Sequence, residues 1–197
     1  MTTEENITWE ERRAATKDMI SRLSPVTDQF IKQMDTQNGV YILAYPGKEL
    51  GVSLWNDSDA PKVVYVGRSK FNSSRHFMDG MTGTSTIRRS LAALLETTLD
   101  LKPIPRSDSP EDNDRYNNYK LDQVGETKLS QWMANNFSAA FLELPEDKIE
   151  SMELALIDYN EPMFNFQHNP GNHYGNQIKA YRKQCAETAY KNEGKYI

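Results

Sequence analysis

Glu153 is the residue whose chemical type is most out of place in the sequence. It lies in the segment Ile149–Ile157, whose apolar residues have the spacing of one helix face, and it falls inside that face. Burying an unpaired carboxylate is costly, so we expect Glu153 to have a basic partner, a metal ion, a bound proton or a place at the edge of a crevice. A position at the rim, from which the side chain reaches water, is the alternative.

Two tyrosines are expected on neighbouring strands. Residues 39–45 and 63–66 are β-branched and aromatic runs bounded by Gly, Pro and Asp, a pattern typical of strands. Because side chains alternate between the two faces of a strand, Tyr41 and Tyr65 can lie close together on one face if the strands pair. Tyrosine is also a common packing residue in strands, so this pattern alone leaves a structural role open.

Arg88 and Arg89 follow the capping residues 84–86 and fall in the first turn of the expected helix. Cations there oppose the helix dipole, at a cost of ~0.3–1 kcal/mol each. Their position becomes favourable when an anion such as a phosphate lies at that helix end. Arg75 and His76, in the preceding loop, are candidates for another phosphate contact or a proton-transfer imidazole. Solvated charges and an incidental histidine are the alternatives.

The charge distribution is uneven. The chain has 23 Lys and Arg against 28 Asp and Glu, a formal net charge of −5, which by itself argues against a nucleic-acid partner. Two segments, residues 68–89 and 179–195, nevertheless carry a local excess of basic residues. Chance clustering on solvated faces is the alternative. If the segments bind nucleic acid, the candidate contacts are Arg68, Lys70, Arg89, Lys179, Arg182 and Lys183.

Length and composition limit the class of protein. A chain of 197 residues with 38% hydrophobic residues fits one domain with a real core. The single cysteine, Cys185, excludes an intrachain disulfide and a cysteine-cluster metal site. The sequence has no run near the ~20 apolar residues that span a bilayer, so we expect no membrane association. Its polar, acidic start is not typical of a signal peptide, and we expect a cytoplasmic protein.

The elements that must position these residues form an α/β pattern of three strands interleaved with helices. Residues 8–34 predict two short helices separated at Ser24–Pro25. Proline and acidic residues in the segment from residue 100 to about 126 predict a loop or mobile insertion. The remaining expected elements are a helix starting at Thr86, a short helix at 129–135, a strand at 137–144, and helices at 146–159 and 176–191.

Three short motifs resemble those of the GIY-YIG nuclease superfamily. Gly39–Tyr41 is similar to the first signature triplet and Tyr65–Gly67 to the second, each with Val in place of Ile. The segment Glu153–Asn165 is similar to the C-terminal signature, in which Glu is followed at fixed intervals by Ile, Pro and Asn. One triplet alone would be weak evidence, but all three motifs in order form a specific combination.

The resemblance implies an α/β fold with a small three-stranded antiparallel sheet flanked by helices. It implies an endonuclease that hydrolyses phosphodiester bonds in DNA with one divalent cation, Mg²⁺ or Mn²⁺. In this comparison Glu153 is the metal ligand, Tyr41 activates the attacking water and Tyr65 helps to position water or phosphate. Asn165 braces the site and is grouped with the nucleic-acid contacts.

The resemblance also implies an arginine that stabilises the phosphate. Many members carry it about ten residues after the second signature tyrosine, which corresponds to Arg75, often with a histidine four residues later, where this chain has Asp79. That segment is predicted as a loop, whereas the helix dipole favours Arg88. Both arginines therefore stay candidates, and we favour Arg88.

The sequence predicts a nuclease domain at residues 36–167, with an N-terminal helical extension at 1–35 and a C-terminal basic helix at 168–197. We expect the parts outside the motifs to set substrate choice. Two other functions remain open: a non-catalytic nucleic-acid-binding module with the same fold, and a structural or protein-interaction domain, which would suit the net charge of −5.

Overall fold

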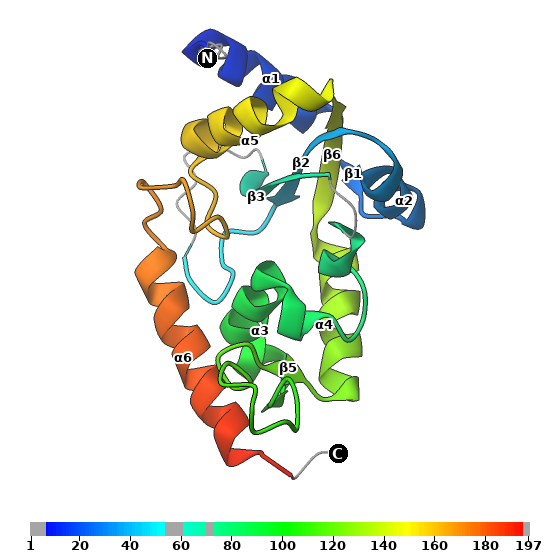
Figure 1. The fold of residues 1–197 in the computed structure, drawn as a ribbon. Coiled ribbons are helices and arrows are strands. Elements are labelled where there is room, and N and C mark those ends of the chain that lie inside the picture. Colours follow the sequence, from blue (N-terminus) through cyan, green and yellow to red (C-terminus); the bar gives the residue numbers. More distant parts are fainter. Residues whose placement is uncertain (1–6, 54–60, 70–72, 195–197) are drawn as a thin grey trace. The chain divides into compact units, whose positions relative to one another are not determined.

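The structure is a computed structural model that describes residues 7–53, 61–69 and 73–194 (Figure 1). The chain divides into two compact units, and each is assembled from segments that are separate in the sequence. We call them unit 1 and unit 2 and describe each by itself. Of the described residues, unit 1 contains 7–47, 61–69, 73–74 and 136–173, and unit 2 contains 48–53, 75–135 and 174–194.

Unit 1 is built on an antiparallel sheet with the strand order β1-β6-β2-β3. Its three long strands are β2 (Gly39–Tyr45), β3 (Lys62–Arg68) and β6 (Ser138–Glu143). They confirm the predicted three-stranded antiparallel sheet. The sequence missed the fourth strand, β1 (Ser24–Pro25), because its two residues mark a break between helices and become a strand only by pairing with distant β6.

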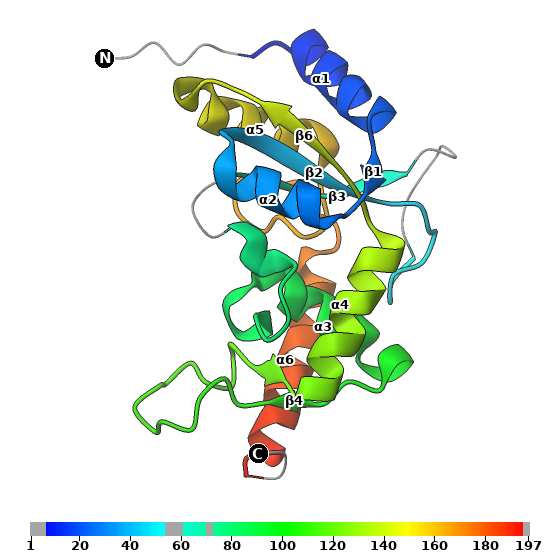
Figure 2. The same ribbon diagram turned by 90° about the vertical axis from the view of Figure 1, so that its right-hand side faces the viewer.

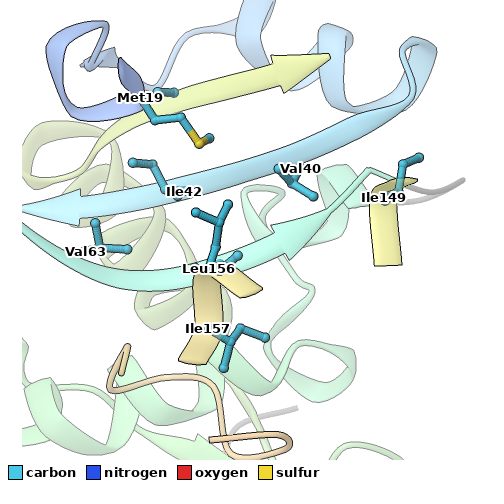
Figure 3. Packing of buried hydrophobic residues seen from close by; sticks show 9 residues of the cluster. Met19, Val40, Ile42, Val63, Ile149, Leu156 and Ile157 are labelled. Carbon is cyan, nitrogen blue, oxygen red and sulfur yellow. The ribbon is translucent and has the colours of Figure 1, made fainter. Parts of the chain in front are cut away.

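Helices cover both faces of this sheet. Unit 1 contains α1 (Trp9–Ser21), α2 (Asp28–Thr36) and α5 (Glu146–Asn160). The apolar core lies between α1, α5 and one face of the sheet and contains Met19, Val40, Ile42, Val63, Val66, Ala140, Ile149, Leu156 and Ile157 (Figure 3). The opposite face carries α2 (Figure 2). There the rings of Phe30 and Tyr41 are 6.3 Å apart, so the tyrosine face is covered by α2.

Unit 2 is mostly helical. Its helices are α3 (Thr86–Leu99), α4 (Gln123–Asn136, whose last residue belongs to unit 1) and α6 (Gly175–Lys191). Helix α3 packs against α6, and buried residues of both helices form the interior. Two short 3₁₀ turns precede α3: η1 (Ser73–His76), which crosses the boundary between the units, and η2 (Thr82–Thr84).

The segment expected to be an acidic loop insertion is folded. Strands β4 (Pro103–Ile104) and β5 (Lys120–Leu121) pair with each other, and Arg106 forms two hydrogen bonds to the carboxylate of Asp112 between them. Helix α4 starts at Gln123, six residues before the expected start at 129. Residues 105–119 are turns and bends, as a loop prediction expects, but the sequence missed β4 and β5, because each is a strand only through its pairing with the other across this segment.

No helix among the described residues is long and apolar enough to cross a membrane.

Candidate active site

The two tyrosines lie side by side on the face of the sheet that carries α2. The ring centroids of Tyr41 and Tyr65 are 6.0 Å apart, and the ring planes are inclined by 47°. Tyr41 stands directly opposite Gly67 in the pairing of β2 with β3, so the three residues share one face. Strand alternation predicted this proximity, and the structure confirms it. Tyr41 is 1% exposed, whereas Tyr65 is partly exposed.

The glycines of both triplets occupy positions where another part of the chain comes very close. A Cβ atom at Gly67 would lie 2.6 Å from Cζ and Oη of Tyr41. A Cβ atom at Gly39 would lie 2.2 Å from the carbonyl oxygen of Leu142 and 2.8 Å from the ring of Phe141. Real side chains do not tolerate such distances. Gly67 therefore allows the ring of Tyr41 to lie across β3.

Glu153 has the basic partner that its place on the apolar face of α5 predicts. Nε of Arg68 lies 3.3 Å from Oε2 of Glu153, and Nη1 of the same arginine lies 3.3 Å from Oε1 of Glu150. The Glu153 side chain is 18% exposed, so it is partly buried but open to solvent. Since Arg68 follows Gly67 directly, the end of β3 contacts both the carboxylate and the Tyr41 ring.

Asn165 holds the outer edge of β3. Its Oδ1 accepts a hydrogen bond of 2.9 Å from the backbone N–H of Val66, and its Nδ2 donates one of 2.8 Å to the carbonyl oxygen of Val66. The neighbouring Phe164 N–H donates to the carbonyl oxygen of Val64 at 3.0 Å. These bonds fix the backbone between Tyr65 and Gly67. The predicted bracing geometry is present, and the amide is used for it rather than for a nucleic acid.

Arg88 has a different environment from the one we expected. Its guanidinium is 0% exposed and lies 2.7 Å from a carboxylate oxygen of Glu126. Its Nε donates to the hydroxyl of Thr82 at 3.2 Å, and its Nη1 donates to the hydroxyl of Ser130 at 3.0 Å. The predicted cap is present, with Ser85 at the N-cap of α3. The anion at this helix end is the chain's own carboxylate, and burial contradicts a phosphate contact by Arg88.

His76 is also buried in unit 2. Its Nδ1 lies 2.8 Å from the hydroxyl oxygen of Ser85, so the histidine supports the residue that caps α3. Burial, together with the charges of Arg75 and Arg88, lowers the pKa of His76 to about 3. A neutral imidazole with this pKa can neither attract phosphate by charge nor take up a proton near neutral pH. Neither predicted role of His76 fits this environment.

Arg89 is buried as well, which does not fit the predicted contact with nucleic acid. Its Nη1 donates to the carbonyl oxygens of Thr82 at 3.2 Å and Gly83 at 2.8 Å, and its Nη2 donates to the hydroxyl of Thr86 at 3.3 Å. Burial lowers the pKa of Arg89 to about 10, so it remains charged. The guanidinium ties the turn η2 to the start of α3.

Arg75, the competing arginine, is partly exposed in η1. The residue before it is fixed within unit 1, because the backbone N–H of Ser74 donates to the carboxylate of Asp35 at 3.1 Å. Arg75 therefore keeps a solvent-accessible side chain on an anchored backbone, whereas Arg88 does not.

The remaining basic candidates differ in exposure. Lys179 and Lys183 are exposed on α6, and Arg182 is partly buried, which lowers its pKa. Lys70 lies outside the described residues. Among the described residues of this group, the two lysines are therefore the most accessible to a partner in solution.

A family comparison decides between the functional classes that the sequence left open. The model of the GIY-YIG catalytic domain matches residues 36–184, which is more than half of the chain. The chain belongs to the GIY-YIG nuclease family. It is therefore an enzyme of the nuclease class, whose reaction is phosphodiester hydrolysis and whose substrate is a nucleic acid. Searches of curated proteins and of solved structures found no match.

GIY-YIG enzymes typically depend on a metal ion. Within the described ranges, no group of three or more His, Cys, Asp or Glu side chains is arranged to hold one. A single carboxylate still suits Mg²⁺, which keeps several water ligands and often binds one or two protein carboxylates. Glu153 meets this requirement because it is partly exposed and has the carboxylate of Glu150 beside the same guanidinium. The residues present fit a largely hydrated divalent cation.

Two carboxylates near the predicted residues were missed by sequence analysis. Glu150 had a detectable signal, because it lies three residues before Glu153 and therefore on the same side of the helix. Glu126 had none, since it contacts Arg88 from another helix, 38 residues along the chain.

Proposed function

We propose that this GIY-YIG enzyme is a DNA endonuclease in which water attacks a backbone phosphodiester beside Tyr65, Tyr41 and Glu153. The supporting observation is the end of β3. Within four residues this strand places Tyr65 beside Tyr41, makes room for the Tyr41 ring at Gly67, and joins Glu153 through Arg68. The end of β3 therefore contacts both kinds of signature residue, the tyrosines on the face of α2 and Glu153 from α5 on the other face.

The exposure of the two phenols favours different roles from those expected. A residue that orients or deprotonates water must reach that water. Tyr65 is partly exposed, whereas Tyr41 is 1% exposed and lies against Phe30 and Gly67. In our proposal Tyr65 contacts the attacking water, and Tyr41 orients Tyr65 from the neighbouring strand.

Glu153 would hold the divalent cation, with Glu150 next to it on α5. When bound, the cation supplies positive charge that polarises the phosphate and lowers the cost of forming hydroxide. The chain's own residues bind and orient the reactants: the phenols position water, and the fixed backbone of β3 holds the phenols in place.

Arg75 is our choice for the residue that stabilises the phosphate. It has the position given by the family spacing, and its side chain is partly exposed. Arginine suits this role because its planar donors match phosphate oxygens, and their attraction grows as negative charge accumulates in the transition state. Lys179 and Lys183 would supply additional contacts to the DNA backbone.

The decisive experiment measures single-turnover cleavage of supercoiled, branched and single-stranded DNA, and of RNA, with Mg²⁺ and with chelator. We expect metal-dependent DNA cleavage by the wild type and a loss of ~10³-fold or more in Glu153→Gln. Asp158→Asn is the matched control, since it neutralises another carboxylate of α5 that pairs with an arginine. Binding without cleavage would overturn the proposal, and cleavage restricted to RNA would reassign the substrate.

The same assay separates the assigned side chains. Tyr65→Phe should lower the rate at saturating DNA by ~10²–10³-fold, and Tyr41→Phe should lower it less. Arg75→Ala should lower it by ~10²–10³-fold, and Arg75→Lys should recover little because an ammonium lacks the planar donor pair. A larger loss in Tyr41→Phe than in Tyr65→Phe would restore the roles first expected from the sequence.

A further inference from the structure

Arg68 joins the two carboxylates on one side of α5. Its Nε and Nη1 atoms each lie 3.3 Å from a carboxylate oxygen, the first from Glu153 and the second from Glu150. The two acidic residues are three positions apart on α5, so one helical turn presents both. The group of three carries a formal charge of −1, and its arginine is at the end of the strand that supports Tyr65.

This ion-pair group is not needed to attach α5 to the sheet. The helix is held by its buried residues Ile149, Leu156 and Ile157, which pack against Val40 and Ile42. The Glu150 side chain is 73% exposed, and ion pairs with such exposure add little to stability. The pair of Arg68 with Glu150 is therefore better explained by binding than by stability.

The chemistry of the three side chains suits an exchange of cations. A hydrated divalent ion binds the same carboxylate oxygens that Arg68 now approaches, and its double charge suits two carboxylates better than one guanidinium does. The donors of a displaced arginine match the oxygens of a phosphodiester. One side chain can thus neutralise the carboxylates before loading and contact the substrate afterwards.

We propose that Arg68 is a positioning residue whose guanidinium occupies the position of the divalent cation at Glu153 and Glu150 in the metal-free protein. When the metal and DNA bind, the Arg68 side chain moves to a backbone phosphate. Glu150 then acts as a second carboxylate for the cation. This inference rests on the proposed function, because it takes Glu153 as the metal ligand.

The first test measures Mn²⁺ binding to the DNA-free protein by calorimetry and by the electron paramagnetic resonance signal of free Mn²⁺. Arg68→Gln should bind Mn²⁺ ~5-fold more tightly, because a competing positive charge is removed. Glu150→Gln should bind it ~3-fold more weakly, and Arg68→Gln/Glu150→Gln should lose most of the gain. Asp158→Asn, the control on the same helix, should bind like the wild type. Unchanged or weaker Mn²⁺ binding by Arg68→Gln would overturn the proposal.

The second test measures single-turnover cleavage at saturating Mn²⁺ and DNA. Arg68→Gln should cleave ~10-fold or more slowly despite its tighter Mn²⁺ binding, and Arg68→Lys should recover part of the rate. A purely structural role would not move metal affinity and cleavage rate in opposite directions, and an unchanged melting temperature would show that Arg68→Gln is folded. If Glu153→Gln still cleaves, the proposed function fails. If Glu153→Gln is inactive but Arg68→Gln binds Mn²⁺ like the wild type, only this inference fails.

Discussion

Nη2 of Arg88 lies 2.7 Å from Oε2 of Glu126, and the two side chains are 0% and 3% exposed. The carboxylate also accepts from the hydroxyl of Thr82 at 2.8 Å and from the backbone N–H of Leu121 at 3.2 Å. A buried pair persists only when such additional bonds compensate for the lost hydration of both charges. Arg88 and Glu126 thus connect α3, α4 and the β4–β5 ribbon within unit 2.

We predict that Arg88→Ala and Glu126→Gln each lower the free energy of unfolding by about 3–5 kcal/mol, because each leaves its partner buried without its counter-charge. Urea denaturation followed by circular dichroism measures the change. Arg106→Ala is the matched control, since its pair with Asp112 is more exposed and should cost only about 0–1 kcal/mol. Equal losses in the Arg88 and Arg106 variants would contradict this interpretation.

The low pKa of His76 predicts a loss of stability in acid. Above pH 6.5 the histidine is neutral in both the folded and unfolded states, so it contributes no pH dependence. Between pH 6.5 and about 3 the unfolded state binds a proton that the folded state does not, so stability falls as the pH is lowered. The slope is ~1.4 kcal/mol per pH unit, and the total loss over this interval approaches about 5 kcal/mol.

His76→Asn tests this origin, because its amide can still contact Ser85 but does not titrate. The free energy of unfolding, measured from pH 7 to pH 4, should depend less on pH in this variant than in the wild type. His173→Gln, which changes a side chain that is 83% exposed, should keep the wild-type profile. Identical profiles for wild type and His76→Asn would assign the acid sensitivity to other groups.

Gly67→Ala should damage the site more than the fold. Its methyl group would meet the Tyr41 ring at 2.6 Å, so the phenol must move. We expect a loss of about 1–3 kcal/mol in unfolding free energy and a drop of at least ~10²-fold in cleavage rate. In a Tyr41→Leu background the same alanine should cost less stability, because the shorter side chain leaves space. Equal costs in both backgrounds would show that the ring is not the obstacle.

The exposed lysines of α6 should contribute to DNA affinity rather than to the rate of cleavage of bound DNA. Neutralising Lys179 and Lys183 together should lower the slope of log affinity against log salt by roughly 2, about one unit for each phosphate that no longer meets a lysine. Fluorescence anisotropy over a salt series measures the slope. Lys17→Gln/Lys32→Gln, which neutralises exposed lysines of α1 and α2, is the control. A collapse of single-turnover cleavage at saturating DNA would place α6 in the catalytic centre instead.

The sequence predicted those features of the site that follow from strand alternation, helix capping or the apolar face of a helix. Strand alternation was sufficient to bring Tyr41 and Tyr65 together, because the register of β2 with β3 preserves a shared face. The capping sequence was sufficient to place the start of α3 at Thr86, with Ser85 at its N-cap. The apolar face of α5 was sufficient to require a partner for Glu153, and the structure supplies Arg68.

Sequence reasoning failed where the identity of a partner depends on tertiary packing. The position of Arg88 correctly predicted an anion, but Glu126 is on another helix and no local spacing connects the two. The same applies to His76. Its place in a loop gave no sign that the side chain would be buried against Ser85, the N-cap of α3. At this helix start Arg88 does meet an anion, which belongs to the chain itself, whereas Arg89 donates to neutral oxygens.

The bonds from Asn165 to Val66 have a consequence for self-association. β3 is the last strand of its sheet, and an uncovered last strand offers N–H and C=O groups to any other extended chain. The amide of Asn165 occupies both of these groups at Val66, and Phe164 occupies the carbonyl of Val64. At the opposite end of the sheet, Pro25 in β1 has no N–H to donate. An Asn165→Ala enzyme should consequently aggregate through strand addition at β3. The Asn165 side chain therefore keeps the protein soluble in addition to bracing the site.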